Sequence, residues 1–258
     1  MTLALLRPEW AAPPGVGAAM SQRSGGVSVG PFESLNLSFG VGDDASDVAE
    51  NRRRWVAAIG VQPVWMRQVH GTEVLRLTAE HRALAEGAPL YTADAAWTTE
   101  PGLACTVGAA DCMPVLLALR DGSAVAAAHA GWRGLAAGVL EATVGALCRG
   151  TGARPDDVCA WLGPCIGPRR FEVGADVLAA FGHAAERSDA SRFAPHRRAD
   201  GSAAWLANLP RLARDRLEAA GLAAITGTAA CTVEDASRFF SFRRDRVTGR
   251  MAAAIWRG

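Results

Sequence analysis

Hydrophobic and polar positions alternate along this chain in two distinct patterns. Short apolar runs bounded by glycine, proline or aspartate predict buried strands, and they are densest between residues 93 and 130. Longer stretches, with apolar residues three or four positions apart, predict helices over 43–60, 135–147, 173–181 and 209–222. Further strands are predicted over 158–162 and 250–256. Because strands dominate the middle and helices flank them, we expect an α+β fold of stacked layers.

Capping signals predict where the first long helix begins and ends. Asp47 is a candidate N-cap for the helix over 43–60, and Glu50 stands three residues later, as a capping box requires. Gly60 follows the last apolar position and is typical of a residue that ends a helix. This segment therefore has the best-defined boundaries of the predicted helices.

Turn residues predict two hairpins and one irregular region. Residues 64–70 and 72–77 are predicted to pair as a hairpin that turns at Gly71. The Asp-Gly pair at 121–122 joins two apolar runs and predicts a second hairpin. The charged stretch 183–203 predicts an irregular loop. Residues 79–90 are polar and rich in alanine, which predicts a surface excursion.

Composition indicates an ordinary globular protein. The 258 residues are 50% hydrophobic and 21% charged, and we find no repeat or linker that would divide them, so we expect a single domain over 1–258 with residues 1–14 flexible. A net charge of +1 provides no field that favours nucleic acid or an anionic membrane. No apolar stretch predicts a membrane span or a signal peptide. Six cysteines without a CxxC pair predict reduced thiols in the cytoplasm and no disulfides.

Three residues of metal-ligating type stand at the ends of predicted strands. His70 closes the run VWMRQVHG, Cys112 opens the run after GAAD, and His129 ends the run AVAAAHAG. Two imidazoles and one thiolate, with a fourth position open, make the donor set of a catalytic zinc site. Taken singly, each has a simpler interpretation as a structural histidine or a small buried hydrophobe. Asp111, next to Cys112, is a candidate acid or base, or a residue that orients a ligand.

Arginines in loops rich in glycine, serine or asparagine are candidates for binding phosphate. A guanidinium group suits phosphate because it offers paired donors in one plane. Arg133 stands out because it lies four residues after His129 and opens a predicted helix, while Arg52 and Arg23 are further candidates. For any single arginine, however, a surface charge or an ion pair is the more common role.

Eight motifs run in order over nearly the whole chain, from about residue 15 to the end. They are QRSGGVS, SLNLSFGVGDD, ENRRR, QVHG, ADCMPV, HAGWRG, WLGPCIGPRRFEVG and FFSFRRDRVTGRMAAAIW. This order resembles the YfiH family, whose members are known as polyphenol oxidase or laccase-domain proteins and as zinc-dependent purine nucleoside phosphorylases. QVHG, ADC and HAGWRG in that order are the most specific part of the resemblance. Phe242 departs from the pattern, because the family often carries tyrosine there.

The resemblance implies one domain folded as a four-layer αββα sandwich. It implies that His70, Cys112 and His129 bind one zinc ion. It also implies phosphorolysis of adenosine, inosine and methylthioadenosine with inorganic phosphate as co-substrate, and a further adenosine deaminase activity. We therefore expect small-molecule nucleosides as partners, a monomeric protein, and substrate contacts from Arg133, Arg52, Arg23 and Asn36.

Three other functions stay open on the sequence alone. A copper-dependent phenol oxidase needs many histidines, whereas this chain has five, of which His81, His183 and His196 lie in polar stretches. A cysteine-nucleophile hydrolase would use Cys112 with His129, and it would fit the editing of cell-wall precursors that is linked to bacterial members of the family. A non-enzymatic binding module is disfavoured by three inward-facing reactive residues. Metal analysis separates the hydrolase from the zinc enzyme, because a nucleophile must be free of zinc.

Overall fold

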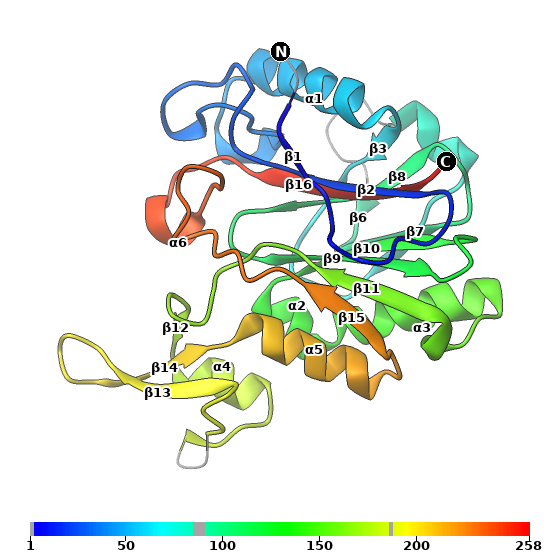
Figure 1. Cartoon of the computed structure of the whole chain (residues 1–258). Coiled ribbons are helices and arrows are strands. Elements are labelled where there is room, and N and C mark those ends of the chain that lie inside the picture. The colour runs from blue at the N-terminus through cyan, green and yellow to red at the C-terminus, as the bar shows by residue number, and fades with distance from the viewer. Residues whose placement is uncertain (1–2, 85–90, 186–187) are drawn as a thin grey trace.

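Two β-sheets stack face to face in the computed structural model, which describes residues 3–84, 91–185 and 188–258 (Figure 1). The first sheet has the strand order β1 (Leu5–Leu6), β2 (Val16–Ser21), β16 (Met251–Arg257), β8 (Leu103–Ala109), β3 (Gln62–Val64). The second has the order β15 (Ala224–Gly227), β11 (Val158–Leu162), β9 (Met113–Leu119), β10 (Val125–Ala130), β7 (Ala95–Thr98), β5 (Val74–Arg76). The first sheet thus begins within the stretch that was expected to be flexible.

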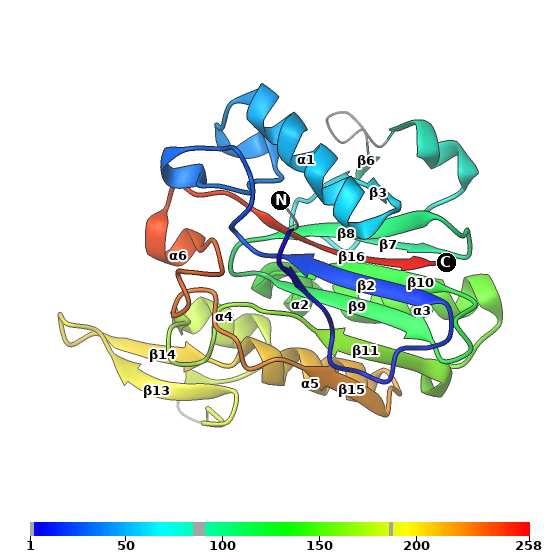
Figure 2. The ribbon, with the colours of Figure 1, turned by 45° about the horizontal axis from the view of Figure 1, so that its top comes forward.

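Helices cover the outer faces of both sheets, as Figure 2 shows from a second direction. One helix, α1 (Ala45–Ile59), lies over the first sheet, and the second sheet is covered by α2 (Trp132–Ala137), α3 (Val139–Thr151) and α5 (Leu209–Ala219). The order helix, sheet, sheet, helix confirms the predicted αββα sandwich. Smaller elements are α4 (Ala175–Ala180), α6 (Phe242–Asp245), the paired strands β4 (Met66–Arg67) and β6 (Tyr91–Thr92), and 3-10 turns at Gly30–Phe32, Phe39–Val41, Ala79–Leu84 and Pro155–Asp157.

Three apolar clusters fill the three interfaces between the four layers. The central cluster joins residues such as Val107 of the first sheet to Leu116 of the second. The outer clusters pack Leu140 against the second sheet and Trp55 against the first. Every residue of β10 is buried, so both faces of this strand contact the core. That explains why its sequence is a continuous run of small apolar residues that ends on a histidine.

The first helix confirms its predicted end and corrects its predicted N-cap. Gly60 has a left-handed φ of 73° at the C-cap, as expected. The N-cap is Asp44, whose carboxylate accepts the backbone N–H of Asp47 at 3.3 Å, so the capping box predicted at Asp47 is wrong. Glu50 pairs with Arg54 on the next turn at 2.7 Å instead. The helix begins at Ala45, near the start predicted from the apolar pattern, so Asp44 is the cap and Asp47 already lies inside the first turn.

The hairpin predicted around Gly71 is wrong, whereas the Asp-Gly hairpin is confirmed. Strand β4 pairs with β6 and β5 pairs with β7, both in parallel, so the two predicted arms join different sheets. At the other turn, β9 and β10 pair antiparallel and the Ser123 N–H bonds the Asp121 carboxylate at 2.8 Å. Local turn residues specify the hairpin at Asp121, whereas the strands on either side of Gly71 pair with strands that are more distant in the sequence.

Two further segments differ from expectation. The helix predicted over 135–147 is two helices, because Gly138 adopts a left-handed φ of 100° between α2 and α3. The loop predicted over 183–203 contains β13 (Phe193–Arg197), which pairs with β14 (Ala203–Ala207) beside β12 (Glu172–Val173) in a projecting three-stranded sheet. Parts of the predicted surface segments, 85–90 and 186–187, lie outside the described residues.

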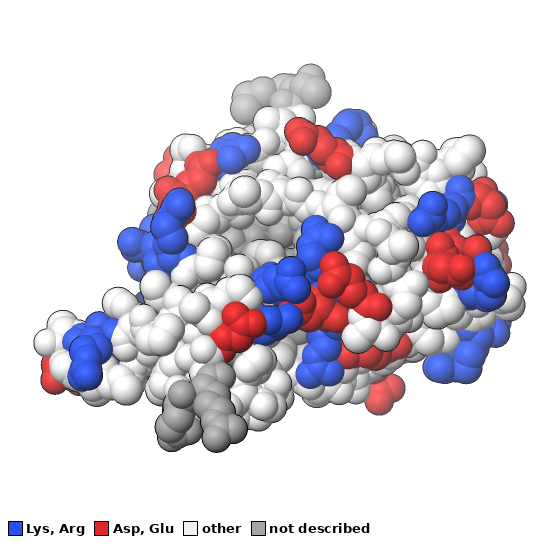
Figure 3. Space-filling view, turned by 60° about the horizontal axis from the view of Figure 1, so that its bottom comes forward, with Lys and Arg blue, Asp and Glu red and all other residues white. Residues whose placement is uncertain are grey.

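Charges of both signs are interspersed on the face formed by the second helical layer, as Figure 3 shows. Arg216 pairs with Glu141 at 2.9 Å across two helices, and Arg211 pairs with Asp215 at 2.8 Å within one helix. Among the described helices, none is both long and apolar enough to cross a membrane.

The break between α2 and α3 generates a stability prediction. Gly138→Ala should lower the free energy of unfolding by about 1–2 kcal/mol, because a residue with a Cβ atom is strained in the left-handed region. Gly145→Ala is the matched control inside α3, where the new Cβ meets only the flexible end of Arg149 at 2.9 Å. Helix propensity should make that change stabilising, by up to about 1 kcal/mol. Denaturant unfolding measures both, and an equal loss in the two variants would contradict the account.

Candidate metal centre

The three ligand-type side chains predicted from the sequence lie together at one end of the second sheet. Their nearest donor atoms are all within 4.8 Å of one another, and Cys112 Sγ lies 3.5 Å from His70 Nε2. The two imidazole rings meet edge to face, with centroids 4.8 Å apart. His129 belongs to β10, Cys112 directly precedes β9, and His70 lies in the loop after β4. Burial decreases from His129, which is 4% exposed, through half-buried Cys112 to exposed His70.

A buried carboxylate that the sequence analysis missed holds this cluster in place. Asp94 is fully buried, and its Oδ1 lies 2.8 Å from His129 Nδ1. The same carboxylate accepts the backbone N–H groups of Val69 at 3.0 Å, His70 at 2.9 Å and Gly71 at 2.7 Å. Because Nδ1 of His129 is engaged, its Nε2 is the nitrogen available to a metal. A carboxylate behind a histidine is the usual way that proteins fix a metal-binding imidazole.

Glycine next to the cluster leaves the space that a metal ion needs. A Cβ atom at Gly131 would lie 2.6 Å from the His70 ring and 2.9 Å from Cys112 Sγ. Any other residue there would therefore push into the group of donors. The donor set and this open space both fit a metal ion held by His70, Cys112 and His129, as in catalytic zinc sites.

The backbone carries strain where it presents these donors. His70 has a φ of 61° and Asp111, directly before Cys112, has a φ of 89°. Non-glycine residues rarely adopt such angles, and they cost free energy that the surroundings must offset. Part of that support comes from Gln68, whose side chain exchanges two hydrogen bonds with the backbone of Gly108 at 2.7 and 2.9 Å. Strained positive φ values at both loops are typical of a functional site.

Charges within the cluster favour a thiolate beside an imidazolium when no metal is bound. Burial alone would raise the pKa of Cys112, but the charge of His129 and hydrogen bonds from both histidines lower this pKa to about 6. Burial would likewise lower the pKa of His129, yet the thiolate and Asp94 raise this pKa to about 9. The cluster therefore holds its cysteine in the form that binds metal or attacks an electrophile.

Asp111 lies beside the cluster but directs its carboxylate to another segment. Its Oδ1 accepts the Thr232 hydroxyl at 2.6 Å, and its Oδ2 accepts the backbone N–H of Arg243 at 2.6 Å. Its own carbonyl accepts the N–H of Ile166 at 2.9 Å. These contacts favour the orienting role over the acid or base role, because they fix the turn that carries Cys112.

The predicted substrate-binding residues lie in different settings. Arg133 is exposed and stacks on Trp132 at 4.3 Å, and it lies two residues after Gly131. Arg52 is buried between aromatic rings, 3.9 Å from that of Trp65, and donates to a backbone carbonyl at 2.9 Å. Burial lowers the pKa of Arg52 to about 9. These contacts place the Arg52 side chain in the packing of the first helical layer, and its contact with a substrate stays a prediction.

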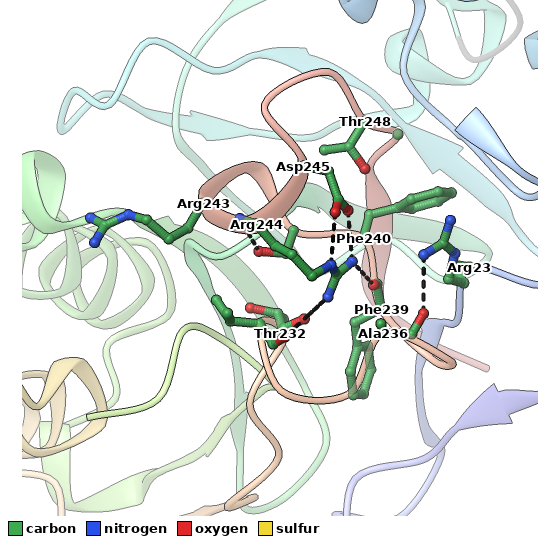
Figure 4. A network of polar contacts seen from close by, with 12 residues as sticks. Arg23, Thr232, Ala236, Phe239, Phe240, Arg243, Arg244, Asp245 and Thr248 are labelled. Atoms are coloured by element: carbon green, nitrogen blue, oxygen red, sulfur yellow. Dashed lines mark hydrogen bonds and ion pairs between the residues drawn. The ribbon is translucent and has the colours of Figure 1, made fainter. Parts of the chain in front are cut away.

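Arg23 and Asn36 support loops near the start of β16. Arg23 donates to the carbonyl oxygens of Glu33 and Ala236, each at 3.0 Å, and lies over the ring of Phe240 at 4.9 Å (Figure 4). Asn36 is fully buried, and its Oδ1 accepts the backbone N–H of Arg250 at 2.9 Å. Because its side chain is buried, Asn36 can affect a substrate only indirectly, by positioning the backbone of Arg250.

The remaining histidines and cysteines lie outside this cluster. His81 bonds the backbone of Thr78, His183 packs on Phe193, and His196 lies 3.2 Å from Glu172. The six cysteines are free thiols, including Cys165 and Cys231, whose backbones pair in an isolated parallel β-bridge. Among the described residues, His70, Cys112 and His129 form the one group of three or more that could hold a metal ion.

Comparisons with known proteins place this geometry in a family. The family described as multi-copper polyphenol oxidoreductase laccase matches residues 17–258, so the chain belongs to this family. It is 47% identical to a protein of Pseudomonas aeruginosa and 46% identical to YfiH of Escherichia coli, each named a purine nucleoside phosphorylase, with 98% of each chain covered. A crystal structure of a Neisseria meningitidis protein superposes with a TM-score of 0.86 at 41% identity, over 98% of both chains.

The contacts of Asp94 generate a prediction about metal affinity. Asp94→Asn should weaken the binding of added metal, with Zn²⁺ as the probe, by about 10- to 100-fold, because an amide removes the charge behind His129 and cannot accept all four N–H groups. Asp121→Asn is the matched control, since that carboxylate only caps an exposed turn. Competition titration with a chromophoric chelator measures both affinities. Equal affinities for the two variants would show that Asp94 does not support the metal centre.

A second prediction separates the cysteines. Cys112→Ala should remove bound metal, whereas Cys165→Ala should retain it, because only Cys112 contributes Sγ to the cluster. Elemental analysis of the purified variants measures this directly. Equal metal loss from both would instead indicate a site that uses two cysteines.

Proposed function

We propose that this member of the laccase-like family is a zinc-dependent purine nucleoside phosphorylase. The convergence of His70, Cys112 and His129 at an open position carries the proposal, and the names of the relatives supply the reaction. Phosphate would attack C1′ of the nucleoside while the purine base leaves. The proposed substrates are adenosine, inosine and methylthioadenosine, with deamination of adenosine as a further activity and the cytoplasm as the location.

Zinc fits the cluster better than several copper ions do. Multicopper chemistry needs many histidine ligands, and the other three histidines of the described chain are engaged elsewhere. Two imidazoles and a thiolate suit a single Zn²⁺ ion. Bound there, zinc would supply Lewis-acid polarisation and lower the pKa of a bound water.

The residues of the chain have separable tasks in this proposal. Asp94 orients His129 and fixes the loop of His70, which keeps the donors preorganised. Asp111 positions the turn before Cys112 through its bonds to the 232–243 segment. Arg133, exposed beside the cluster, would hold phosphate through its paired N–H donors.

A second candidate function is a cysteine-nucleophile hydrolase. One observation favours it: the metal-free cluster stabilises a thiolate on Cys112 beside protonated His129, with pKa values of about 6 and about 9. The two functions differ in whether activity needs the metal. Chelation that removes zinc should abolish phosphorolysis but should activate a cysteine nucleophile.

Phosphate dependence tests the proposed reaction. Purified protein should release hypoxanthine from inosine only with inorganic phosphate present, and it should form ribose-1-phosphate in equal amount. Chromatography of base and sugar phosphate measures both products. Base release at the same rate without phosphate would identify a nucleosidase instead.

The role of Arg133 is tested by truncation. Arg133→Ala should reduce phosphorolysis by about ten- to a thousandfold while zinc content is retained, because the guanidinium stabilises an anion and is no ligand of the metal. Wild-type kinetics in this variant would remove Arg133 from the phosphate site.

A further inference from the structure

A buried turn between α6 and β16 presents polar groups that lack partners. Thr248 is 2% exposed, and within the described chain its Oγ1 has no hydrogen-bond partner. Burying a hydroxyl without a partner costs free energy, so such a group in a native fold calls for a specific explanation. Figure 4 shows Thr248 at the end of the loop that runs from Arg243 past Asp245.

Arg250 lies two residues later, and only part of its guanidinium group forms hydrogen bonds within the described chain. Its Nη1 donates to the carbonyl oxygens of Thr248 at 2.9 Å and Gly249 at 3.0 Å. Its Nε and Nη2 have no hydrogen-bond partner among the residues that the structure describes. The guanidinium is half-buried and lies over the ring of Phe242 at 5.8 Å. Stacking on one face leaves the N–H edge available, which is how arginine binds phosphate.

The backbone of this turn is held rigidly. A Cβ atom at Gly249 would lie 2.8 Å from the ring of Phe240 and 2.9 Å from Asn36, so the chain passes too close for another residue. Asn36 accepts the N–H of Arg250, and Leu37 donates to the carbonyl of Arg250 at 3.1 Å. The unpartnered donors therefore come from a fixed framework and not from a loose loop.

The same turn is joined to the metal centre. The backbone N–H of Arg243 bonds Asp111, the residue before Cys112, and Phe242 stands next to Arg243. Arg244 anchors this segment by donating to the carbonyl oxygens of Thr232 at 2.8 Å and Phe239 at 3.0 Å (Figure 4). Burial lowers the pKa of Arg250, while the charges of Cys112 and Asp111 oppose that change, which agrees with their proximity.

We propose that the turn from Thr248 to Arg250 is a phosphate subsite of this enzyme. It rests on the proposed phosphorolysis and adds to Arg133 a second, preorganised anion-binding group. The N–H edge of Arg250 and the hydroxyl of Thr248 donate to phosphate oxygens, and Arg23, over the Phe240 ring that meets this turn, adds positive charge. Phosphate completes the hydrogen bonds that the folded chain leaves unmade.

Two substitutions test the subsite on zinc-loaded protein. Arg250→Gln should raise the KM for phosphate by about ten- to a hundredfold, since it removes a charged pair of donors. Thr248→Val should raise it by about three- to tenfold, the effect of one hydrogen bond. Arg76→Gln, another arginine stacked on a ring, and Thr143→Val, a buried hydroxyl with a partner, are matched controls that should leave this KM unchanged.

Phosphate protection against heat gives a readout that needs no turnover. Inorganic phosphate should raise the Tm of the wild type by mass action, and this increase should be smaller in Thr248→Val and smallest in Arg250→Gln. Without phosphate, Thr248→Val should unfold at the wild-type temperature or above, because it removes an unpartnered buried hydroxyl. A structural role predicts the opposite, a lower Tm with the phosphate effect intact.

The outcomes separate this inference from the function on which it rests. Phosphate-dependent base release with an unchanged phosphate KM in both variants would overturn the subsite and leave the phosphorylase standing. Phosphate protection that the variants lose, in a protein that cleaves no nucleoside, would support the subsite and overturn the phosphorylase. A wild type that phosphate does not stabilise would overturn the subsite.

Discussion

The carboxylate of Asp94 is the buried charge that organises the candidate metal centre. A fully buried charge is tolerated only when hydrogen bonds replace its hydration. Here three consecutive backbone N–H groups from Val69 to Gly71 and the imidazole of His129 provide those bonds. The need of this carboxylate for hydrogen bonds thus brings the loop from Val69 to Gly71 next to the end of β10, where His129 lies. The rings of His70 and His129 lie next to each other because the backbone N–H of His70 and the imidazole of His129 both form hydrogen bonds with Asp94.

A second carboxylate, that of Asp111, positions the backbone next to Cys112. Asp111 offsets its own strained φ by bonding the 232–243 segment, and so it joins the turn of Cys112 to α6. From α6 the chain continues through the rigid turn at Gly249 into β16. The candidate metal ligands and the proposed phosphate subsite therefore share one framework. The proposed phosphorolysis would need this arrangement, because catalysis depends on holding nucleophile and leaving group in fixed relation.

Burial of apolar runs is the reason why the sequence predicts both the layers of this fold and the three ligand-type residues. Apolar runs must be buried, and a histidine or cysteine at the end of such a run must find partners nearby. Asp94 was missed because one aspartate before AAW resembles an ordinary strand boundary, although a carboxylate opening a buried run always needs partners. The Gly71 turn was misjudged because β6 and β7 supply its strand partners, and no local pattern identifies them. Arg250 was interpreted only as the start of a strand, because unpartnered donors become visible only in three dimensions.

Anomalous diffraction at the zinc absorption edge tests the central claim most directly. Crystals of the purified protein should show one strong zinc peak per chain, bonded to Nε2 of His70, Sγ of Cys112 and Nε2 of His129. Nδ1 of His129 should remain bonded to Asp94. A zinc peak elsewhere, several copper peaks, or a metal-free cluster in protein that retains phosphorolysis would contradict the account.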